Sequence, residues 1–203
     1  MAELPVREGL RERKKRLTRD TLTANALRLF EQRGFDQVTT AEIADASNVA
    51  VKTLFVYFPT KEDLVFADEE EVLERLRAQL REREPGHSEV HAVRALAHDL
   101  IAEERSNPIE GLGSFARLIG DNSTLHSRLQ LMWERWEQAV AEVLAQERDG
   151  VTHDPAIRIR AALLVAPFRA LTSSDVRNHT EVAADVSRWL DQSFDLIAQG
   201  LGE

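Results

Sequence analysis

The chain has 203 residues, no cysteine, 26 Lys and Arg residues, 35 Asp and Glu residues, and a formal net charge of −9. The lack of cysteine excludes disulfide frameworks, thiolate zinc sites and cysteine nucleophiles. No apolar stretch approaches the roughly 20 residues that cross a bilayer, and the N-terminus lacks the basic-then-apolar layout of a signal peptide. We therefore expect a cytoplasmic protein. The average charge alone argues against a nucleic-acid partner.

The charge is unevenly distributed. Residues 1–65 carry a net charge of +1, whereas residues 66–203 carry −10. Seven basic residues between Arg7 and Arg19 outnumber Glu8 and Glu12, which gives this segment a charge of +5. It is either a solvated leader or the charged first turns of a helix. It indicates DNA binding only if an element that reads DNA lies beside it. Its candidate DNA contacts are Arg11, Arg13, Lys14 and Lys15.

Three helices are predicted in the first sixty residues. Apolar positions at three-to-four spacing predict a helix from about residue 18 to residue 33, ended by Gly34. Thr40 is expected to cap a second, short helix. Asn48 tolerates the left-handed conformation and predicts a tight turn. A third short helix follows over about 51–58, and Pro59 ends it.

The rest of the chain shows no strand-like alternation, so we predict an all-α fold of about nine helices. Thr60 and Asp63 are expected to open a fourth helix. Ser88 is expected to cap the next one, and Thr180 with Glu181 to begin the last. These six predicted helices cover residues 61–83, 88–106, 109–119, 124–148, 155–177 and 180–200. The predicted domains are residues 1–65 and residues 66–203.

Two short helices joined by a tight turn, after a longer helix, form a helix-turn-helix pattern. In that geometry the second helix enters the major groove. Small three-helix units of this spacing also occur in proteins that bind no DNA, so the pattern alone leaves function open. Leu54 and Phe58 lie on the opposite face and are expected in the core. The candidate groove residues are Val51, Lys52, Thr53, Phe55 and Tyr57, and the candidate phosphate contacts are Thr39, Thr40 and Lys61.

The residues themselves resemble a known family. The runs TTAEIADA at 39–46, NV at 48–49 and TLFVYFPTKEDL at 53–64, with ALRLF at 26–30 and RGF at 33–35, resemble the DNA-binding domain of TetR-family transcriptional regulators. The resemblance spans about residues 13–66. The chain departs from the usual family pattern at Asn48, Ala50, Lys52 and Phe55, which leaves the operator sequence open.

The resemblance implies a role for each matched residue. Thr40 and Lys61 take phosphate-contact positions near helix N-termini, and Tyr57 takes another. Val51, Lys52, Thr53 and Phe55 take groove-lining positions. Lys52 would donate to guanine O6 and N7 or make a nonspecific phosphate contact. The basic segment would enter a minor groove or lie along phosphates.

The resemblance also implies a homodimer, a near-palindromic operator and a small-molecule effector. The homodimer is expected to form through residues 155–200, which carry broad apolar surfaces. The alternative interpretation is that these surfaces belong to the core of a single chain. An aromatic stripe on the helix predicted over 124–148 fits either a ligand pocket or core. The candidate ligand-binding residues are Phe115, Arg117, Met132, Trp133, Trp136 and Phe168, with His98, Asn122 and His126 as further polar anchors.

Other candidate chemistry is weak. His87 and His91 have the i, i+4 spacing of a metal pair but no defined third ligand, so exposed histidines are favoured. Glu69, Glu70 and Glu71 are expected on a solvated face. No catalytic motif is found, so we expect no enzyme activity and no cofactor. The sequence predicts a ligand-responsive repressor associated with the nucleoid; the alternatives are a helical sensor module without specific DNA binding and an all-α enzyme.

Overall fold

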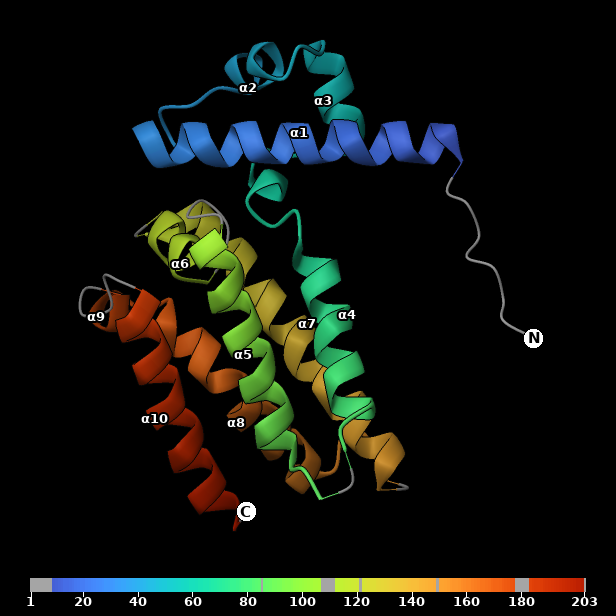
Figure 1. Ribbon diagram of the computed structural model, residues 1–203, viewed down its shortest axis with the longest axis vertical. Helices are drawn as coiled ribbons and strands as arrows, with labels where there is room; N and C mark the ends of the chain where they lie inside the picture. The colour runs from blue at the N-terminus through green and yellow to red at the C-terminus, as the bar shows by residue number, and fades with distance from the viewer. Residues whose placement is uncertain are drawn as a thin grey trace. The chain divides into compact units, whose positions relative to one another are not determined.

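The computed structural model describes residues 9–84, 86–106, 112–120, 122–148, 150–177 and 183–202. Within these ranges all regular structure is helical, with ten α-helices, one 3-10 helix and no strand (Figure 1). This confirms the predicted all-α class. The chain divides into two compact units, Met1–Ala67 and Asp68–Glu203. None of the described helices is long and apolar enough to span a membrane.

The N-terminal unit places two short helices on the same side of a long one (Figure 1). It consists of α1 (Leu10–Arg33), α2 (Thr40–Ala46), α3 (Val51–Tyr57) and the 3-10 helix η1 (Glu62–Leu64). Each element contributes apolar side chains to a common core. The side chains that are almost fully buried there include Leu22, Ala26, Phe30, Ile43, Leu54, Phe58 and Leu64.

The first helix is longer than predicted. It begins at Leu10 rather than near residue 18, so residues 10–19 of the basic segment form its first turns. Arginine and lysine are good helix formers even where no apolar periodicity marks a buried face. Gly34, at a φ of 83°, ends the helix as expected.

The predicted fourth helix over 61–83 is divided in two. The Thr60 and Asp63 side chains do cap each other's backbone, with Thr60 N donating to Asp63 at 3.0 Å and Asp63 N to Thr60 Oγ1 at 3.2 Å. They begin only the single turn of η1, and α4 (Glu69–Arg81) starts after a turn. Leu64, Val65 and Phe66 are all buried. Three consecutive side chains point to different sides of an α-helix, so a continuous helix would not bury all of them against one surface.

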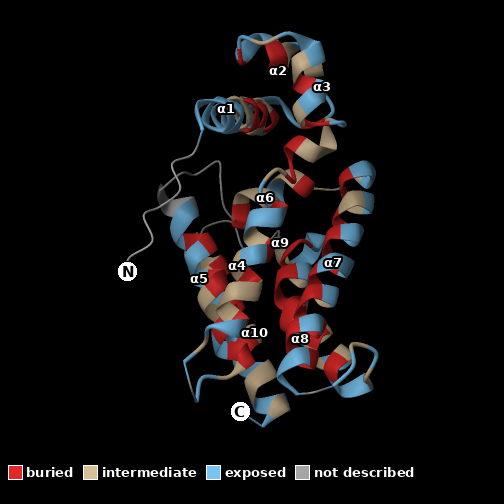
Figure 2. Ribbon diagram, turned by 90° about the vertical axis from the view of Figure 1, so that its right-hand side faces the viewer, coloured by how far each residue is buried: buried red, intermediate tan, exposed pale blue. Residues whose placement is uncertain are grey.

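The C-terminal unit is a bundle of long helices. It contains α4, α5 (Glu89–Ser106), α6 (Leu112–Ile119), α7 (Ser123–Glu147), α8 (Pro155–Leu171), α9 (Ser174–Arg177) and α10 (Ala183–Leu201). Helix α7 packs against α4 and α8, and α10 packs against α5 and α8. The buried residues of α7 and α8 lie on the sides that these helices turn toward each other (Figure 2).

Two predicted boundaries in this unit have clear outcomes. Ser88 caps α5 as expected, since its Oγ accepts from His91 N at 3.2 Å. The single helix predicted over 155–177 ends at Leu171, and α9 begins at Ser174. The predicted start at Thr180 and Glu181 lies outside the described residues.

Glu69 corrects the expectation of a solvated acidic face. Glu70 and Glu71 are exposed, but Glu69 is buried. Its carboxylate accepts hydrogen bonds from Arg128 and, at 2.6 Å, from Arg135 Nη1, both on α7. A buried carboxylate needs such partners because its charge loses the solvation of water. Glu69 therefore fastens the first turn of α4 to α7.

We expect Glu69→Gln to lower the free energy of unfolding by about 1–3 kcal/mol, the usual cost of leaving buried hydrogen-bonding groups without a full partner. This is less than the loss expected for a fully buried ion pair, because Arg128 and Arg135 are partly exposed. Urea denaturation followed by circular dichroism measures the change. Glu71→Gln removes a charge from the exposed side of the same turn and is the control. Equal stability of the two variants would contradict this role of Glu69.

Candidate functional site

A capping box holds the beginning of α2. Thr39 Oγ1 accepts from Glu42 N at 3.3 Å, and Glu42 Oε2 accepts from Thr39 N at 2.8 Å. The capping residue is thus Thr39, and Thr40 is the first residue of the helix. Glu42 also accepts a hydrogen bond of 2.8 Å from Arg33, in the last turn of α1. The Arg33 hydrogen bond, followed by those from Thr39, lowers the pKa of Glu42 to about 2.

The turn between α2 and α3 has the predicted conformation. Asn48 has a φ of 54°, in the left-handed region. Val49 N donates to Ala44 O at 3.0 Å, and Asn25 on α1 donates through Nδ2 to Ala46 O at 3.2 Å. These contacts fix the direction in which α3 leaves the turn.

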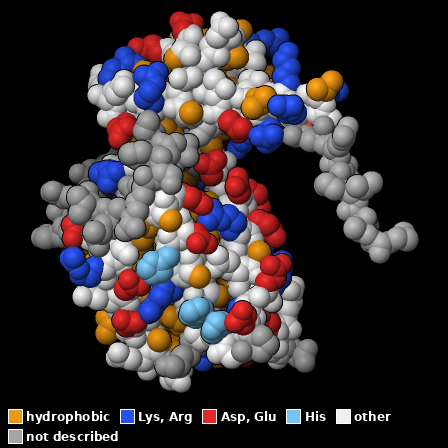
Figure 3. All heavy atoms as spheres, in the orientation of Figure 1, with side chains coloured by type: hydrophobic (Ala, Val, Ile, Leu, Met, Phe, Trp, Pro, Cys, Tyr) orange, Lys and Arg blue, Asp and Glu red, His pale blue; other side chains and the backbone are white. Residues whose placement is uncertain are grey.

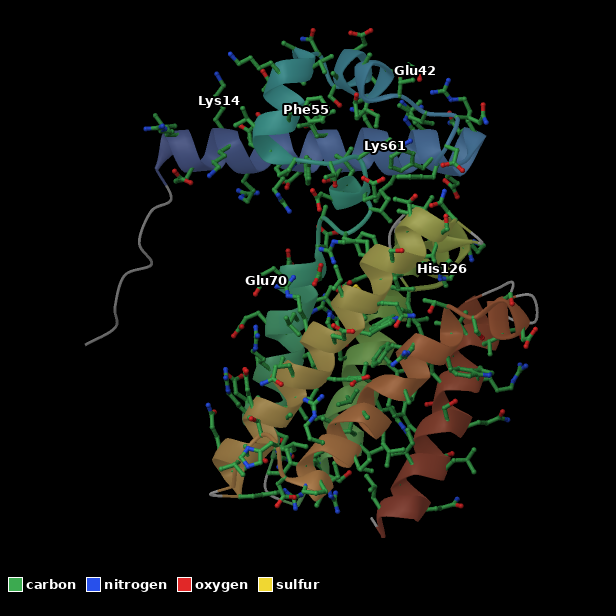
Figure 4. The ribbon with its side chains drawn as sticks, turned by 180° about the vertical axis from the view of Figure 1, so that it is seen from behind. Lys14, Glu42, Phe55, Lys61, Glu70 and His126 are labelled. Atoms are coloured by element: carbon green, nitrogen blue, oxygen red, sulfur yellow. The ribbon has the colours of Figure 1, made fainter. Side chains whose placement is uncertain are left out.

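Helix α3 divides into a buried and an exposed face. Leu54 and Phe58, the residue after the helix, are buried as expected. Thr53 and Tyr57 are half-buried, whereas Val51 and Lys52 are exposed. Phe55 (labelled in Figure 4) is 45% exposed and Val56 is 75% exposed. Sequence reasoning missed Val56, although it lies one turn beyond Lys52 on the same exposed face.

Lys61 already has partners within the N-terminal unit. Its Nζ donates to Phe35 O at 3.0 Å and to Val38 O at 3.1 Å. The ammonium also lies 4.1 Å from the centre of the Phe35 ring. An ammonium has three N–H donors. Two of the three donors of Lys61 hold the loop between α1 and α2. The expected phosphate contact therefore competes with a structural role.

The basic side chains of α1 differ in what they contact. Arg11, Arg13, Lys14 and Lys15 are exposed, and Lys14 projects from α1 on the side where α3 packs (Figure 4). Arg19 donates through Nη2 to Ala67 O at 2.7 Å and lies over the Phe58 ring. The exposed Lys and Arg side chains on the surface of this unit are drawn in Figure 3.

A line of aromatic rings crosses the C-terminal bundle. Trp133 and Trp136 on α7 meet edge to face with ring centroids 5.4 Å apart. Trp136 contacts Phe168 on α8 at 5.6 Å, and Phe168 contacts Phe194 on α10 at 6.0 Å. The structure thus brings together three candidate ligand-binding residues. It adds Phe194, which the sequence reasoning missed because the phase of α10 relative to α7 was unknown.

The other ligand candidates have separate surroundings. Met132 is buried on α7. On α6, Phe115 is half-buried and the exposed Arg117 donates through Nη2 to Ser114 Oγ at 2.7 Å. The three further polar anchors each have a partner: His98 with Asp191, His126 (labelled in Figure 4) with the Gly120 carbonyl, and Asn122 with backbone N–H groups at the start of α7.

The histidine pair carries no assembled metal site. His87 and His91 are exposed and stack with ring centroids 4.3 Å apart. Glu84 lies 3.8 Å from His87 Nδ1. Among the described residues, no group of three or more His, Asp or Glu side chains is placed to hold a metal ion.

The lowered pKa of Glu42 predicts a pH-dependent contribution to stability. Its ordinary value is 4.5 and its folded value about 2, so the contribution is complete above pH 4.5 and is lost as the pH falls to about 2. We expect Glu42→Gln to be less stable than the wild type above pH 4.5, with the difference shrinking below it. Urea unfolding at several pH values between 6 and 2 measures this.

Glu31→Gln, at an exposed position of α1, removes the same charge without disturbing the capping box and serves as the control for Glu42→Gln. A stability difference between wild type and Glu42→Gln that stays constant across this pH range would contradict the assignment.

Comparison with known proteins identifies both parts of the chain. Residues 22–67 match the family described as bacterial regulatory proteins, tetR family, and residues 87–202 match the MftR C-terminal domain. The HTH-type transcriptional regulator TcmR of Streptomyces glaucescens is 30% identical over 168 residues, covering 80% of this chain and 73% of TcmR. The nucleoid occlusion factor SlmA of Shewanella frigidimarina is 27% identical over 171 residues, covering 81% of this chain and 85% of SlmA.

Solved structures show the same fold. A TetR-family transcriptional regulator from Syntrophomonas wolfei has a TM-score of 0.66 and 15% identity, covering 92% of this chain and 97% of its own. Thermus thermophilus FadR, a TetR-family repressor in complex with lauroyl-CoA, has a TM-score of 0.55 and 23% identity, covering 90% and 94%. At these identities the likeness concerns the fold.

Proposed function

The chain belongs to the TetR family of transcriptional regulators, and we propose that it is a ligand-responsive repressor that binds a near-palindromic operator as a homodimer. The observation that carries this proposal is the exposed face of α3. Apolar and basic side chains lie on the exposed side of a helix whose other side is fixed in a core. Such a face has no role within the N-terminal unit and suits the major groove.

In this proposal α3 reads bases and its surroundings hold the backbone. Lys52 donates to guanine O6 and N7, and the exposed Phe55 and Val56 contact apolar base edges such as thymine methyl groups. Thr39, Thr40, Tyr57 and the third N–H of Lys61 face phosphates. Residues 10–19 of the basic segment are helical. This supports contact along phosphates, since a helix is too wide for the minor groove of undistorted DNA.

Helices α8 and α10 form the proposed dimer interface within residues 155–200. Apolar side chains remain exposed on both helices, with Ile159 62% exposed on α8 and Leu196 70% exposed on α10. Leu163 on α8 is also exposed. A second copy of the chain would cover these side chains, and the resulting two-fold symmetry requires a near-palindromic operator.

A small molecule bound in the C-terminal unit is proposed to release the DNA. The ligand needs only a higher affinity for the conformation that does not bind the operator. The lauroyl-CoA complex of FadR supports a ligand-binding role for this fold and leaves the ligand of this chain open. A repressor of this kind would be associated with the nucleoid.

Selection of bound fragments from the whole genome tests the proposal. We expect the enriched fragments to share a near-palindromic sequence, and affinity for the best fragment to fall steeply as salt rises. Binding to that fragment no tighter than to random DNA of equal length would contradict specific recognition and favour a sensor module.

Substitutions at two exposed lysines separate base reading from phosphate contact. We expect Lys52→Ala to lose roughly 1–3 kcal/mol of discrimination at one base position. Lys14→Ala should weaken binding to all sequences alike and reduce the slope of log affinity against log salt by about 1. Titrations of operator variants at several salt concentrations measure both effects. The reverse pattern would exchange the two assignments.

A further inference from the structure

The two units are joined over very few residues. Ala67 is the last residue of the N-terminal unit and Asp68 is the first of the C-terminal unit. Asp68 is also the N-cap residue of α4, with a φ of −96° and a ψ of 5°. Residues 67–69 therefore form the joint between the units. Because a peptide group is planar, each residue has only its φ and ψ bonds to rotate, and a rotation within the joint would turn one unit against the other.

Arginines hold the chain on each side of this joint. Arg19, on α1, donates through Nη2 to the Ala67 carbonyl oxygen at 2.7 Å, in a partly buried position. A held carbonyl oxygen limits the rotation of the whole planar peptide group that follows Ala67. On the other side, Arg128 and Arg135 of α7 donate to the Glu69 carboxylate. Only a short stretch of backbone separates the two anchors.

Arg19 also contacts the end of the helix that is proposed to read DNA. Its guanidinium carbon lies 4.6 Å from the centre of the Phe58 ring. Phe58 is the residue after α3 and is only 1% exposed. A guanidinium is attracted to the face of an aromatic ring, and its hydrogen bond to a carbonyl is strengthened by its charge. The Arg19 side chain thus connects α1, the end of α3 and the joint.

These contacts distinguish Arg19 from the other basic residues of α1. Arg11, Arg13, Lys14 and Lys15 are exposed, whereas Arg19 is half-buried. Its guanidinium is engaged with a ring and a carbonyl oxygen of the N-terminal unit. Arg19 adds to the positive charge of the basic segment, but its surroundings favour a role in geometry over a phosphate contact.

We propose that Arg19 is a positioning residue that limits rotation at the joint and thereby determines which spacing of half-sites the dimer accepts. A half-site is the part of the near-palindromic operator that one subunit binds. Two subunits occupy both half-sites at once only when the separation of their α3 helices matches the separation of the half-sites. This inference rests on the proposed function, of which it specifies the spacing selectivity.

A change of one base pair is large enough to detect this role. It moves a half-site by about 3.4 Å along the DNA axis and turns it by about 35° around that axis. A joint held by Arg19 resists such a displacement, so one of the two reading helices loses its alignment with the bases. A loosened joint follows the displacement and keeps both helices in place.

Three operator lengths test the proposal. The selected DNA fragment is compared with two fragments in which one base pair is added or removed between the half-sites. We expect the wild type to bind the selected spacing about tenfold more tightly than either altered spacing, the scale of losing the contacts to one base pair. Arg19→Met removes the guanidinium but keeps an unbranched side chain, and it should bring this ratio close to one. Fluorescence anisotropy titrations measure the affinities.

Two further variants separate the joint from charge and from folding. Lys15→Met removes a positive charge from an exposed position of the same helix, so it should weaken binding to all three fragments alike and leave the ratio unchanged. A glycine inserted between Ala67 and Asp68 leaves Arg19 and the core in place but adds two freely rotating backbone bonds. It should lower the ratio as Arg19→Met does, and it tests the joint even if circular dichroism shows that Arg19→Met is unfolded.

The outcomes distinguish this role from the proposed function. Wild-type binding to the selected fragment no tighter than to random DNA would refute the proposed function and, with it, the role of Arg19. Specific binding with equal affinity for all three spacings would refute the role of Arg19 alone. So would a wild-type ratio retained in folded Arg19→Met or in the glycine insertion, or a ratio lowered equally by Lys15→Met.

Discussion

The two helices that form the proposed DNA-reading element have seven residues each, and helices this short are not stable by themselves. Isolated helices below about 12–15 residues are marginal in water, so their position must come from their surroundings. Glu42 links α2 to α1, because its carboxylate completes the capping box with Thr39 and also accepts a hydrogen bond from Arg33 at the end of α1. Buried Leu54 then fixes α3 in the same core. The exposed face of α3 is therefore as rigid as the core beneath it.

The C-terminal unit distributes its polar groups in a different way. Two buried carboxylates, Glu69 and Glu89, are the first residues of α4 and α5, where the helix dipole favours negative charge. Arginines compensate both, and those that pair with Glu89 are Arg148 and Arg160. Farther along the bundle the aromatic line carries donors with no such compensation. Ion pairs thus hold helix ends together, while contacts between aromatic rings join α7, α8 and α10 in the interior.

Local signals account for what could be predicted. The left-handed Asn48 and the cap at Ser88 depend on neighbouring residues alone, so the sequence specifies them directly. The start of α1 was missed because a charged run has no apolar periodicity, and the break before α4 because Leu64, Val65 and Phe66 are buried together only in the folded unit. The partners of Lys61 lie more than twenty residues away. Contacts of this kind depend on how the chain returns on itself, which residue spacing does not reveal.

The continuity of α1 through the basic segment also fixes where its charges point. An α-helix of 24 residues is a rod of roughly 36 Å in which each residue is rotated by about 100° from the last. A deletion of one uncharged residue such as Leu17 would keep the number of charges constant. It would nevertheless turn Arg11, Arg13, Lys14 and Lys15 about the axis relative to the buried residues of the same rod. In this segment the angular order of the positive charges is therefore specified by the fold, and net charge alone does not describe what a phosphate backbone would meet.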